Sequence, residues 1–299
     1  MALVVVVPGP GGPGPRTADS GVRRTDPVQR VVAALSSSVR TMRGPVPRAG
    51  DVNVLDFADL FARPAESADA ADGAADELTT ELLRAWWTEA VRIDRFDAGA
   101  DRRGGLLVNG PIDGSIGGIV HGAEEPAELS AALGGGAYFR GPPDLAETEA
   151  RALSRYLTDL KLRHEARDRT QGAILPGTRV VIGHGLGGLI AYEALCALGD
   201  GASVTLVSLG AALCGPEQIF GRLEPAPRNE QGHWPAAVRR WFNVVAHSDP
   251  TAMIAPQLTA RFGPGIEDEV VEIKSSSGDI QPYLLDRVVG RALATGLAR

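Results

Sequence analysis

The stretch RVVIGHGLGGLIAYEAL, from Arg179 to Leu195, decides the fold class. It begins as a short apolar run rich in β-branched residues, passes through a glycine-rich turn, and continues as a helical pattern. Such a run without polar alternation is typical of a strand with both faces covered by helices. Gly183 and Gly187 allow a tight turn and a close approach of strand and helix. The stretch therefore predicts a buried strand, a turn at Gly185 and a helix.

Similar apolar runs recur along the chain and alternate with helical patterns. An α/β fold follows, with a doubly wound, mostly parallel sheet. The expected strands are Leu3–Val7, Val52–Phe57, Thr178–Ile182, Ser203–Ser208, Trp241–Ala246 and Glu269–Lys274.

Four helices are predicted between and after these strands. The first is capped by Asp26 and has Pro27 in its first turn. The helix after the turn begins at Leu186 and stops at the Gly199–Gly201 stretch, because glycine favours a helix C-terminus. The other two carry apolar stripes, at Ala150, Leu153, Leu157 and Leu160, and at Leu284, Leu285, Val288, Val289 and Ala292.

Composition limits the possible functions. The 299 residues are 44% hydrophobic and 22% charged with a net charge of −7, which excludes a disordered chain or a coiled coil. Without a cluster of Lys and Arg, a nucleic-acid partner is not expected. The two cysteines, Cys196 and Cys214, lack metal-ligand spacing, so we expect small core residues and no metal site. The apolar run Ala2–Val7 is too short for a signal peptide or a membrane span, which favours a cytoplasmic protein.

One domain spanning 1–299 is the expected organisation. Residues 62–80, rich in alanine and acidic residues, suggest a flexible loop. Residues 105–145 are rich in glycine and proline and form no clean strand–helix unit. We expect a cap or lid at about residues 105–170.

These features together resemble the α/β-hydrolase superfamily, in particular an actinobacterial branch of it. The glycine-rich turn is similar to the G-x-S-x-G nucleophile elbow of those enzymes, and PGPG after the first strand resembles their HGxG motif. The resemblance runs nearly end to end and is specific for the fold. It includes the segments LDFADLF, LLRAWW, RYLTDLKLR, VSLGAAL, WFNVVAHSDPTA and PYLLDRVVGRAL.

The same resemblance implies a degenerate catalytic triad. Gly185 stands at the nucleophile position and Gly278 at the histidine position, whereas Asp249 matches the acid. Of the two backbone donors of the oxyanion hole, Leu186 retains its N–H, but Pro10 has none. Several components are absent independently, so serine-hydrolase activity of this chain is not expected.

Four polar residues remain as candidates near the cleft. Asp249 is either a turn-forming residue before Pro250 or a carboxylate base at the cleft rim. His247 is an acid/base candidate, with a solvated loop histidine as the alternative. His184 is expected to pack beneath the sheet edge. Asp279 either caps the last helix, the favoured reading, or faces the cleft.

The neighbouring segments provide weaker candidates for the site. Gly9 borders the cleft, but its loop lacks the lysine and the glycine spacing of a phosphate-binding motif. At least one of Trp86 and Trp87 is expected in the core. Trp234, Trp241 and Phe242 either line the cleft or simply pack.

Two classes of function follow. The first is a non-hydrolytic protein whose cleft binds a small molecule or a peptide, repurposed as a cofactor-independent epimerase, lyase or cyclase of a bacterial natural-product pathway. The second is an inactive pseudo-hydrolase with a binding or regulatory role. A serine esterase or peptidase with a substituted nucleophile ranks last. Neither class requires a cofactor, a nucleic acid or a membrane, and the oligomeric state is left open.

Overall fold

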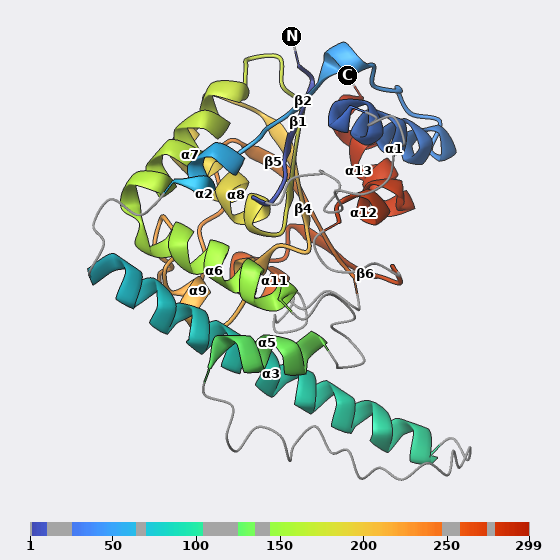
Figure 1. The fold of residues 1–299 in the computed structure, drawn as a ribbon. Helices are drawn as coiled ribbons and strands as arrows, with labels where there is room; N and C mark the ends of the chain where they lie inside the picture. The colour runs from blue at the N-terminus through green and yellow to red at the C-terminus, as the bar shows by residue number, and fades with distance from the viewer. Residues whose placement is uncertain are drawn as a thin grey trace.

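A computed structural model of the chain describes residues 2–10, 26–63, 70–103, 125–134, 144–246, 258–273 and 279–298. Strands and helices alternate along most of the chain (Figure 1). The strands are β1 (Val4–Val7), β2 (Val52–Val54), β3 (Val180–His184), β4 (Val204–Leu209), β5 (Val238–Ala246) and β6 (Ile266–Val271). The helices are α1 (Pro27–Thr41), α2 (Ala58–Ala62), α3 (Ala70–Arg103), α5 (Pro126–Gly134), α6 (Leu145–Thr158), α7 (Leu160–Ala173), α8 (Leu186–Leu198), α9 (Glu217–Phe220), α11 (Leu258–Phe262), α12 (Gln281–Leu285) and α13 (Arg287–Leu297).

The six strands form one sheet in the order β2-β1-β3-β4-β5-β6, and every neighbouring pair is parallel. Alternate residues of β1 lie on opposite faces of the sheet. Val4 and Val6 pack in one core with α1, α12 and α13. Val5 and Val7 pack in the other core with α2, α3, α6, α7 and α8. Helices thus cover both faces, which confirms the predicted α/β class and the two-sided burial of the strands. Figure 1 shows the two helical layers on either side of the sheet.

All six strands were expected close to their observed places, with one marked shift. The last strand runs from Ile266 to Val271, three residues earlier than predicted. It lies at the edge of the sheet and carries Glu267 and Glu269, which face Arg291 at 3.4 and 2.9 Å. An edge strand tolerates charged side chains because one of its sides faces water. These acidic residues obscured the strand in the sequence.

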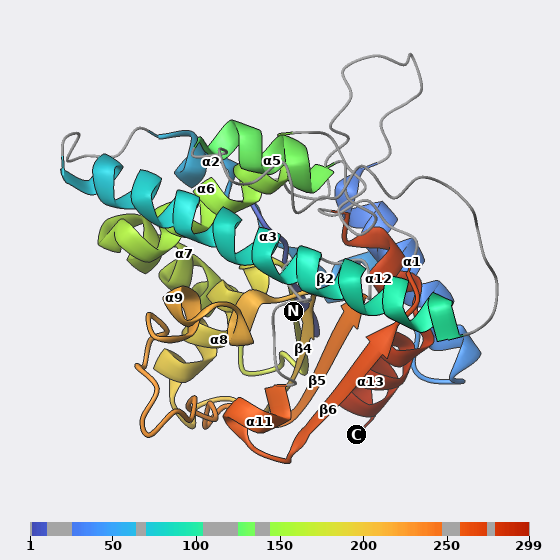
Figure 2. The ribbon, with the colours of Figure 1, turned by 90° about the horizontal axis from the view of Figure 1, so that it is seen from below.

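The expected loop at 62–80 is wrong for residues 70–80, which belong to the 34-residue helix α3. Alanine is a strong helix former, and the helix buries Leu78, Leu82 and Leu83 in the core. Trp86 and Trp87 are 1% and 6% exposed, as expected for core residues. Figure 2 shows α3 crossing the molecule on the side toward which the arrowheads of β5 and β6 point.

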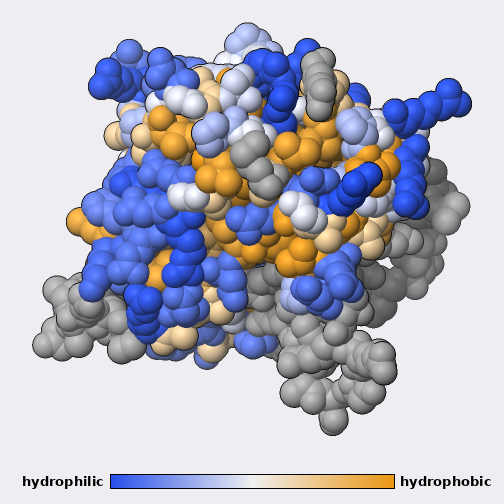
Figure 3. All heavy atoms as spheres, turned by 90° about the horizontal axis from the view of Figure 1, so that it is seen from above, coloured by the Kyte–Doolittle hydropathy of each residue, from blue (hydrophilic) through white to orange (hydrophobic). Residues whose placement is uncertain are grey.

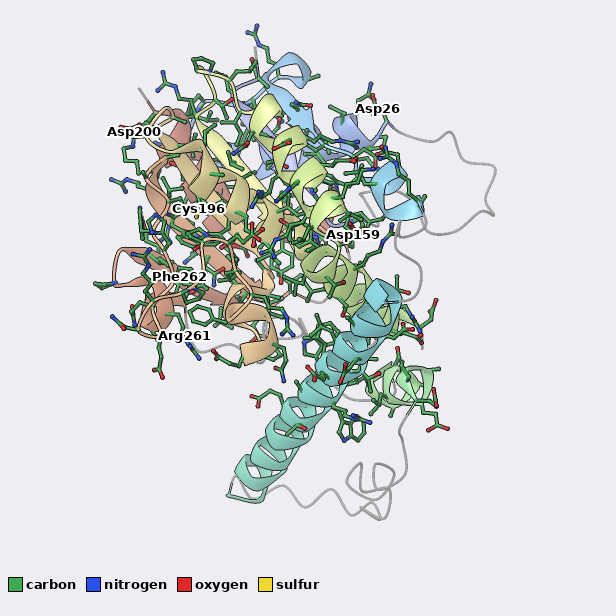
Figure 4. The ribbon with its side chains drawn as sticks, turned by 90° about the vertical axis from the view of Figure 1, so that its left-hand side faces the viewer. Asp26, Asp159, Cys196, Asp200, Arg261 and Phe262 are labelled. Atoms are coloured by element: carbon green, nitrogen blue, oxygen red, sulfur yellow. The ribbon has the colours of Figure 1, made fainter. Side chains whose placement is uncertain are left out.

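The expected cap at about residues 105–170 stays a prediction, except that α6 and α7 belong to the main core. Residues 104–124 and 135–143 lie outside the described residues, but α6 and α7 pack into the same core as β1 and α8. The predicted single stripe through Leu160 is interrupted at Asp159, whose carboxylate accepts a hydrogen bond from the Leu162 N–H at 3.0 Å and so starts α7. Leu160 is consequently 60% exposed. Figure 4 shows Asp159 beside α6 and α7.

Two other predicted helices match well. The Asp26 carboxylate accepts a hydrogen bond from the Val28 N–H at 2.9 Å, so it caps α1 as expected. Helix α8 begins at Leu186 and ends at Gly199, which has a φ of 66°. The expected C-terminal helix is divided into α12 and α13 at Asp286, which caps α13. In the described parts of the chain, no helix has the length and apolarity that crossing a membrane requires.

The end of the molecule opposite α3 carries both termini. Figure 3 shows this end as a mixture of hydrophobic groups and hydrophilic side chains, with hydrophilic residues around much of its margin. The amino ends of the parallel strands point this way. In open α/β sheets, ligands bind instead at the carboxyl ends of the strands. A ligand site is therefore expected at the opposite end of the molecule, where the strands have their carboxyl ends.

Candidate functional site

The carboxyl ends of β1 and β3 lie side by side where the strand order of the sheet reverses direction. After β1 the chain passes into α1, which packs on one face of the sheet, and after β3 it passes into α8 on the opposite face. The two strands are neighbours, and the strand order runs outward from them in both directions. This is a topological switch point, where ligands of doubly wound proteins bind. The loops that meet there are Pro8–Pro10 and the turn at Gly185.

Gly185 forms a sharp turn between β3 and α8. Its φ of 55° and ψ of −126° lie in a region that residues with a side chain rarely occupy. Its N–H donates to the Leu209 carbonyl at 3.0 Å, and its carbonyl accepts from the Gly188 N–H at 3.0 Å. A Cβ built on Gly185 would meet no described atom within 4 Å. A side chain at this position would therefore point away from the packed turn.

The neighbouring glycines have the opposite environment. A Cβ on Gly187 would lie 2.0 Å from the Val7 carbonyl oxygen, and one on Gly183 would lie 2.5 Å from the Gly188 Cα. A Cβ on Gly188 would approach the Ala211 Cβ to 2.4 Å. These glycines let β1, β3 and α8 pack at backbone contact, as the sequence predicted for Gly183 and Gly187.

Around the turn, Gly9, Pro10, Gly185 and Leu186 are all partly exposed. The Cβ position of Gly9 lies 3.8 Å from the His184 carbonyl oxygen, so the two loops adjoin. The first N–H groups of α8 have no partners within the helix and carry the positive end of its dipole. The turn can thus present backbone donors to a neutral or anionic polar group, but it has no nucleophilic side chain.

His184 is 7% exposed, and its ring packs against the ring of Tyr283 with centroids 5.5 Å apart. This burial agrees with the expectation that His184 packs beneath the sheet edge. Tyr283 was not singled out from the sequence. Its hydroxyl accepts a hydrogen bond from the Ala246 N–H at 2.9 Å, at the end of β5. No local sequence pattern indicates this contact, because Ala246 and Tyr283 are 37 positions apart.

Of the remaining candidate positions, the structure describes only Asp279. His247, Asp249 and Gly278 lie outside the described residues. Asp279 is exposed, and its carboxylate accepts from the Gln281 N–H at 2.9 Å at the start of α12. Asp279 therefore bonds the backbone just before α12, whose N-cap residue is Ile280, whereas the last helix, α13, is capped by Asp286 and not by Asp279 as predicted.

A row of polar side chains crosses the sheet on the face covered by α8. Ser208, Asn243 and Asp268 are register neighbours on β4, β5 and β6. The Ser208 hydroxyl accepts from Trp241 Nε1 at 2.9 Å and donates to Asn243 Oδ1 at 2.7 Å. Asn243 Nδ2 donates to Asp268 Oδ1 at 2.6 Å, and Asp268 Oδ2 accepts from the Thr259 N–H at 3.0 Å. The row ties β5 to the start of α11 and thereby fixes both sides of the segment that contains His247 and Asp249.

Trp241 and Phe242, which the sequence assigned to either the cleft or the core, are both 1% exposed. Trp234 packs edge-on against Trp241 with centroids 5.7 Å apart. The aromatic residues are thus packing residues.

A hollow lies on the flank of the molecule, between α2, α6 and α7. It is lined by Leu60, Arg63, Arg155, Asp159, Lys161, Leu162 and Glu165. Its charged groups already have protein partners: Arg63 donates to Glu165 at 2.8 Å, and Arg155 donates to the Phe61 carbonyl at 2.6 Å. These contacts hold α2 against α7 and α6. This hollow is therefore a weaker candidate than the turn at Gly185.

Within the described ranges, no three or more His, Cys, Asp or Glu side chains cluster in a way that could hold a metal ion. Comparisons of the chain with protein-family models, with curated proteins and with solved structures gave no match. The candidate site therefore rests on the geometry of the chain itself.

Proposed function

We propose that this chain is a non-hydrolytic protein of α/β-hydrolase type that binds a small molecule or a peptide at the turn His184–Gly185–Leu186. The observation that carries the proposal is the backbone of Gly185. The turn at Gly185, with a φ of 55°, is partly exposed at the switch point of a parallel sheet, the place where doubly wound proteins bind ligands. Gly185 has no group that could attack a carbonyl, so the proposal is binding without serine chemistry.

A second candidate function is a non-hydrolytic enzyme, such as an epimerase, lyase or cyclase. It is favoured by the position of Asp249, which follows the end of β5 by three residues. The carboxyl ends of β3 and β5 share one edge of the parallel sheet, which supports this candidate. A carboxylate of this kind can remove a proton from a carbon acid held at the turn.

The proposed site is tested by placing one methyl group at the turn. In Gly185→Ala, the methyl group points into the accessible space and costs about 1–3 kcal/mol of backbone strain. Gly199→Ala is a matched control. Gly199 ends the same helix with a φ of 66° and a ψ of −146°, and its Cβ would also meet no described atom within 4 Å. Both variants should therefore lose similar stability, and only one should lose binding.

The three proteins are incubated in D2O with the small-molecule fraction of a bacterial extract, and retained compounds are identified by mass spectrometry. We expect a compound retained by the wild type and Gly199→Ala, with retention by Gly185→Ala reduced about tenfold. Equal retention by all three proteins, or by none, contradicts the proposal. A retained compound that changes mass or gains carbon-bound deuterium identifies the second candidate, the enzyme.

A further inference from the structure

Tyr283 connects two strand ends that are not neighbours in the sheet. Its side chain is 2% exposed, its ring rests on His184 at the end of β3, and its hydroxyl accepts the N–H of Ala246 at the end of β5. Strand β4 lies between these two strands. A single side chain of α12 thus reaches both the residue before Gly185 and the last residue of β5.

Backbone hydrogen bonds at the end of β4, which lies between β3 and β5, complete the connection. The Gly185 N–H donates to the Leu209 carbonyl at 3.0 Å, and the next residue, Gly210, donates to the Val244 carbonyl at 2.9 Å. The turn is therefore joined to β4, β4 to β5, and β5 to Tyr283, which returns to the turn through His184. These contacts form a closed circuit. We therefore expect the loss of one contact to change the geometry of the others.

Helix α12 presents Tyr283 from a fixed position. Asp279 accepts from the Gln281 N–H at the start of the helix, and the Tyr283 carbonyl accepts from the Asp286 N–H at 3.0 Å. Asp286 also accepts from the Val288 N–H at 2.7 Å and starts α13. Leu284, next to Tyr283, is fully buried in the core shared with α1. A displacement of α12 therefore moves the tyrosine ring with it.

We propose that Tyr283 is a positioning residue through which α12 controls the geometry of the turn at Gly185. The regulatory meaning of this contact rests on the proposed function of that turn. The Tyr283 hydroxyl also holds Ala246, so it fixes the position of the carboxyl end of β5 relative to Gly185. An event that shifts α12 would change both at once.

Amide hydrogen exchange of the full-length protein, followed by NMR, tests the proposal without any ligand. Tyr283→Phe keeps the ring and removes the hydroxyl. We expect the Ala246 amide to exchange about tenfold faster, because it loses its acceptor. The amides of Gly185 and Gly210 should also exchange faster, whereas Val181 and Leu206, deeper in β3 and β4, should be unchanged.

Tyr156→Phe provides the matched control. Tyr156 is also buried, and its hydroxyl donates to Glu193 at 2.7 Å on the face covered by α8. We expect no selective change at Gly185 or Gly210 in this variant. Faster exchange of Ala246 alone, or no change in any of the three amides, overturns the proposal. A uniform change in all core amides also overturns it, because it shows only a loss of global stability.

A second variant reaches the same circuit from the exposed end of α12. Asp279→Ala removes the hydrogen bond from the Gln281 N–H and leaves Tyr283 intact. The same three amides should exchange faster, with a smaller change at Ala246 than in Tyr283→Phe. Unchanged exchange of the Gly185 amide in a folded Asp279→Ala protein would show that α12 does not control the geometry of the turn. The amide-exchange experiments do not depend on ligand binding. Failure of the proposed function and failure of the coupling between α12 and the turn are therefore distinct results.

Discussion

The side chains of Arg163 and Glu193 form an ion pair between α7 and α8 in which they are 4% and 0% exposed. Arg163 Nε donates to Glu193 Oε2 at 2.9 Å, and a second guanidinium nitrogen donates to Oε1. The Tyr156 hydroxyl and the Glu224 N–H donate to the same carboxylate at 2.7 and 3.0 Å. Burial and then the nearby Glu193 charge raise the pKa of Tyr156 well above its usual value, so it stays a donor. The buried charge is thus fully satisfied and ties the middle of α8 to α7.

Removing one member of this pair should be costly. Arg163→Met leaves the Glu193 carboxylate buried without its counter-ion, so we expect the free energy of unfolding to fall by about 3–5 kcal/mol. The double variant Arg163→Met with Glu193→Leu should recover much of that loss, because no charge remains buried. Urea denaturation measures both. As a control, Arg151→Met breaks a pair with Asp76 that is 50% and 65% exposed, and should cost below about 1 kcal/mol.

Stability at low pH should depend on Asp59. Hydrogen bonding to Arg169 lowers the pKa of Asp59 from 3.8 to about 2, and the charge of Arg63 acts in the same direction. A carboxyl group with a depressed pKa in the folded state stabilises the fold above its unfolded pKa, and this stabilisation is lost as the pH falls through the folded pKa. The contribution of Asp59 is therefore present above about pH 4 and disappears toward pH 2.

Asp59→Asn should accordingly unfold more easily than the wild type at pH 6 and equally easily near pH 2. Urea denaturation at several pH values measures the difference. Asp59 is exposed, so we also expect high salt to reduce the difference at pH 6. A difference that stays constant from pH 6 to pH 2 would contradict the assigned pKa. Asp76→Asn, at another exposed partner of an arginine, is a suitable comparison.

The strands were predictable from sequence where both of their faces are buried. Val4–Val7 and Val180–His184 are buried along their whole length, and their composition reflects that environment. Edge strand β6 was misplaced because Glu267 and Glu269 face water and arginine partners. The break at Asp159 was missed because apolar periodicity continues across it, although the capping carboxylate ends one helix and starts the next.

The site was predictable only in its local part. Gly183, Gly185 and Gly187 lie in one continuous motif, so the turn and its close packing could be inferred from spacing. The contact of Tyr283 with His184 and Ala246 depends on where α12 packs, which no pattern within α12 specifies. The row from Ser208 to Asp268 was missed for the same reason, since strand register decides which polar residues become neighbours.

Cys196 should be a poorly reactive thiol. It lies on α8 (Figure 4), and burial raises its pKa to about 12, with the neighbouring Tyr192 hydroxyl acting in the opposite direction. Only the thiolate reacts readily with alkylating agents. At pH 8, iodoacetamide should modify Cys196 in the folded protein at least about a hundredfold more slowly than in urea. Peptide mass spectrometry follows Cys196 separately from Cys214. Similar rates in both states would show that the thiol is accessible and ionised.

Two glycines of the same turn, Gly185 and Gly187, should respond very differently to substitution by alanine. Gly187→Ala forces a methyl group to within 2.0 Å of the Val7 carbonyl oxygen and 2.6 Å of the Pro8 carbonyl carbon, and both are backbone atoms with little freedom to move. The gain of about 1 kcal/mol in helix propensity cannot offset this overlap. We expect Gly187→Ala to lose about 3 kcal/mol or more of unfolding free energy.

Gly185→Ala should lose about 1–3 kcal/mol, because it meets backbone strain but no described neighbour. Thermal and urea denaturation of both variants measure the difference. If Gly185→Ala proves the more damaging of the two, the space beside the turn is filled in the folded protein, and a ligand could not reach Gly185. The order of these two losses therefore tests both the packing of α8 against β1 and the accessibility on which binding at the turn depends.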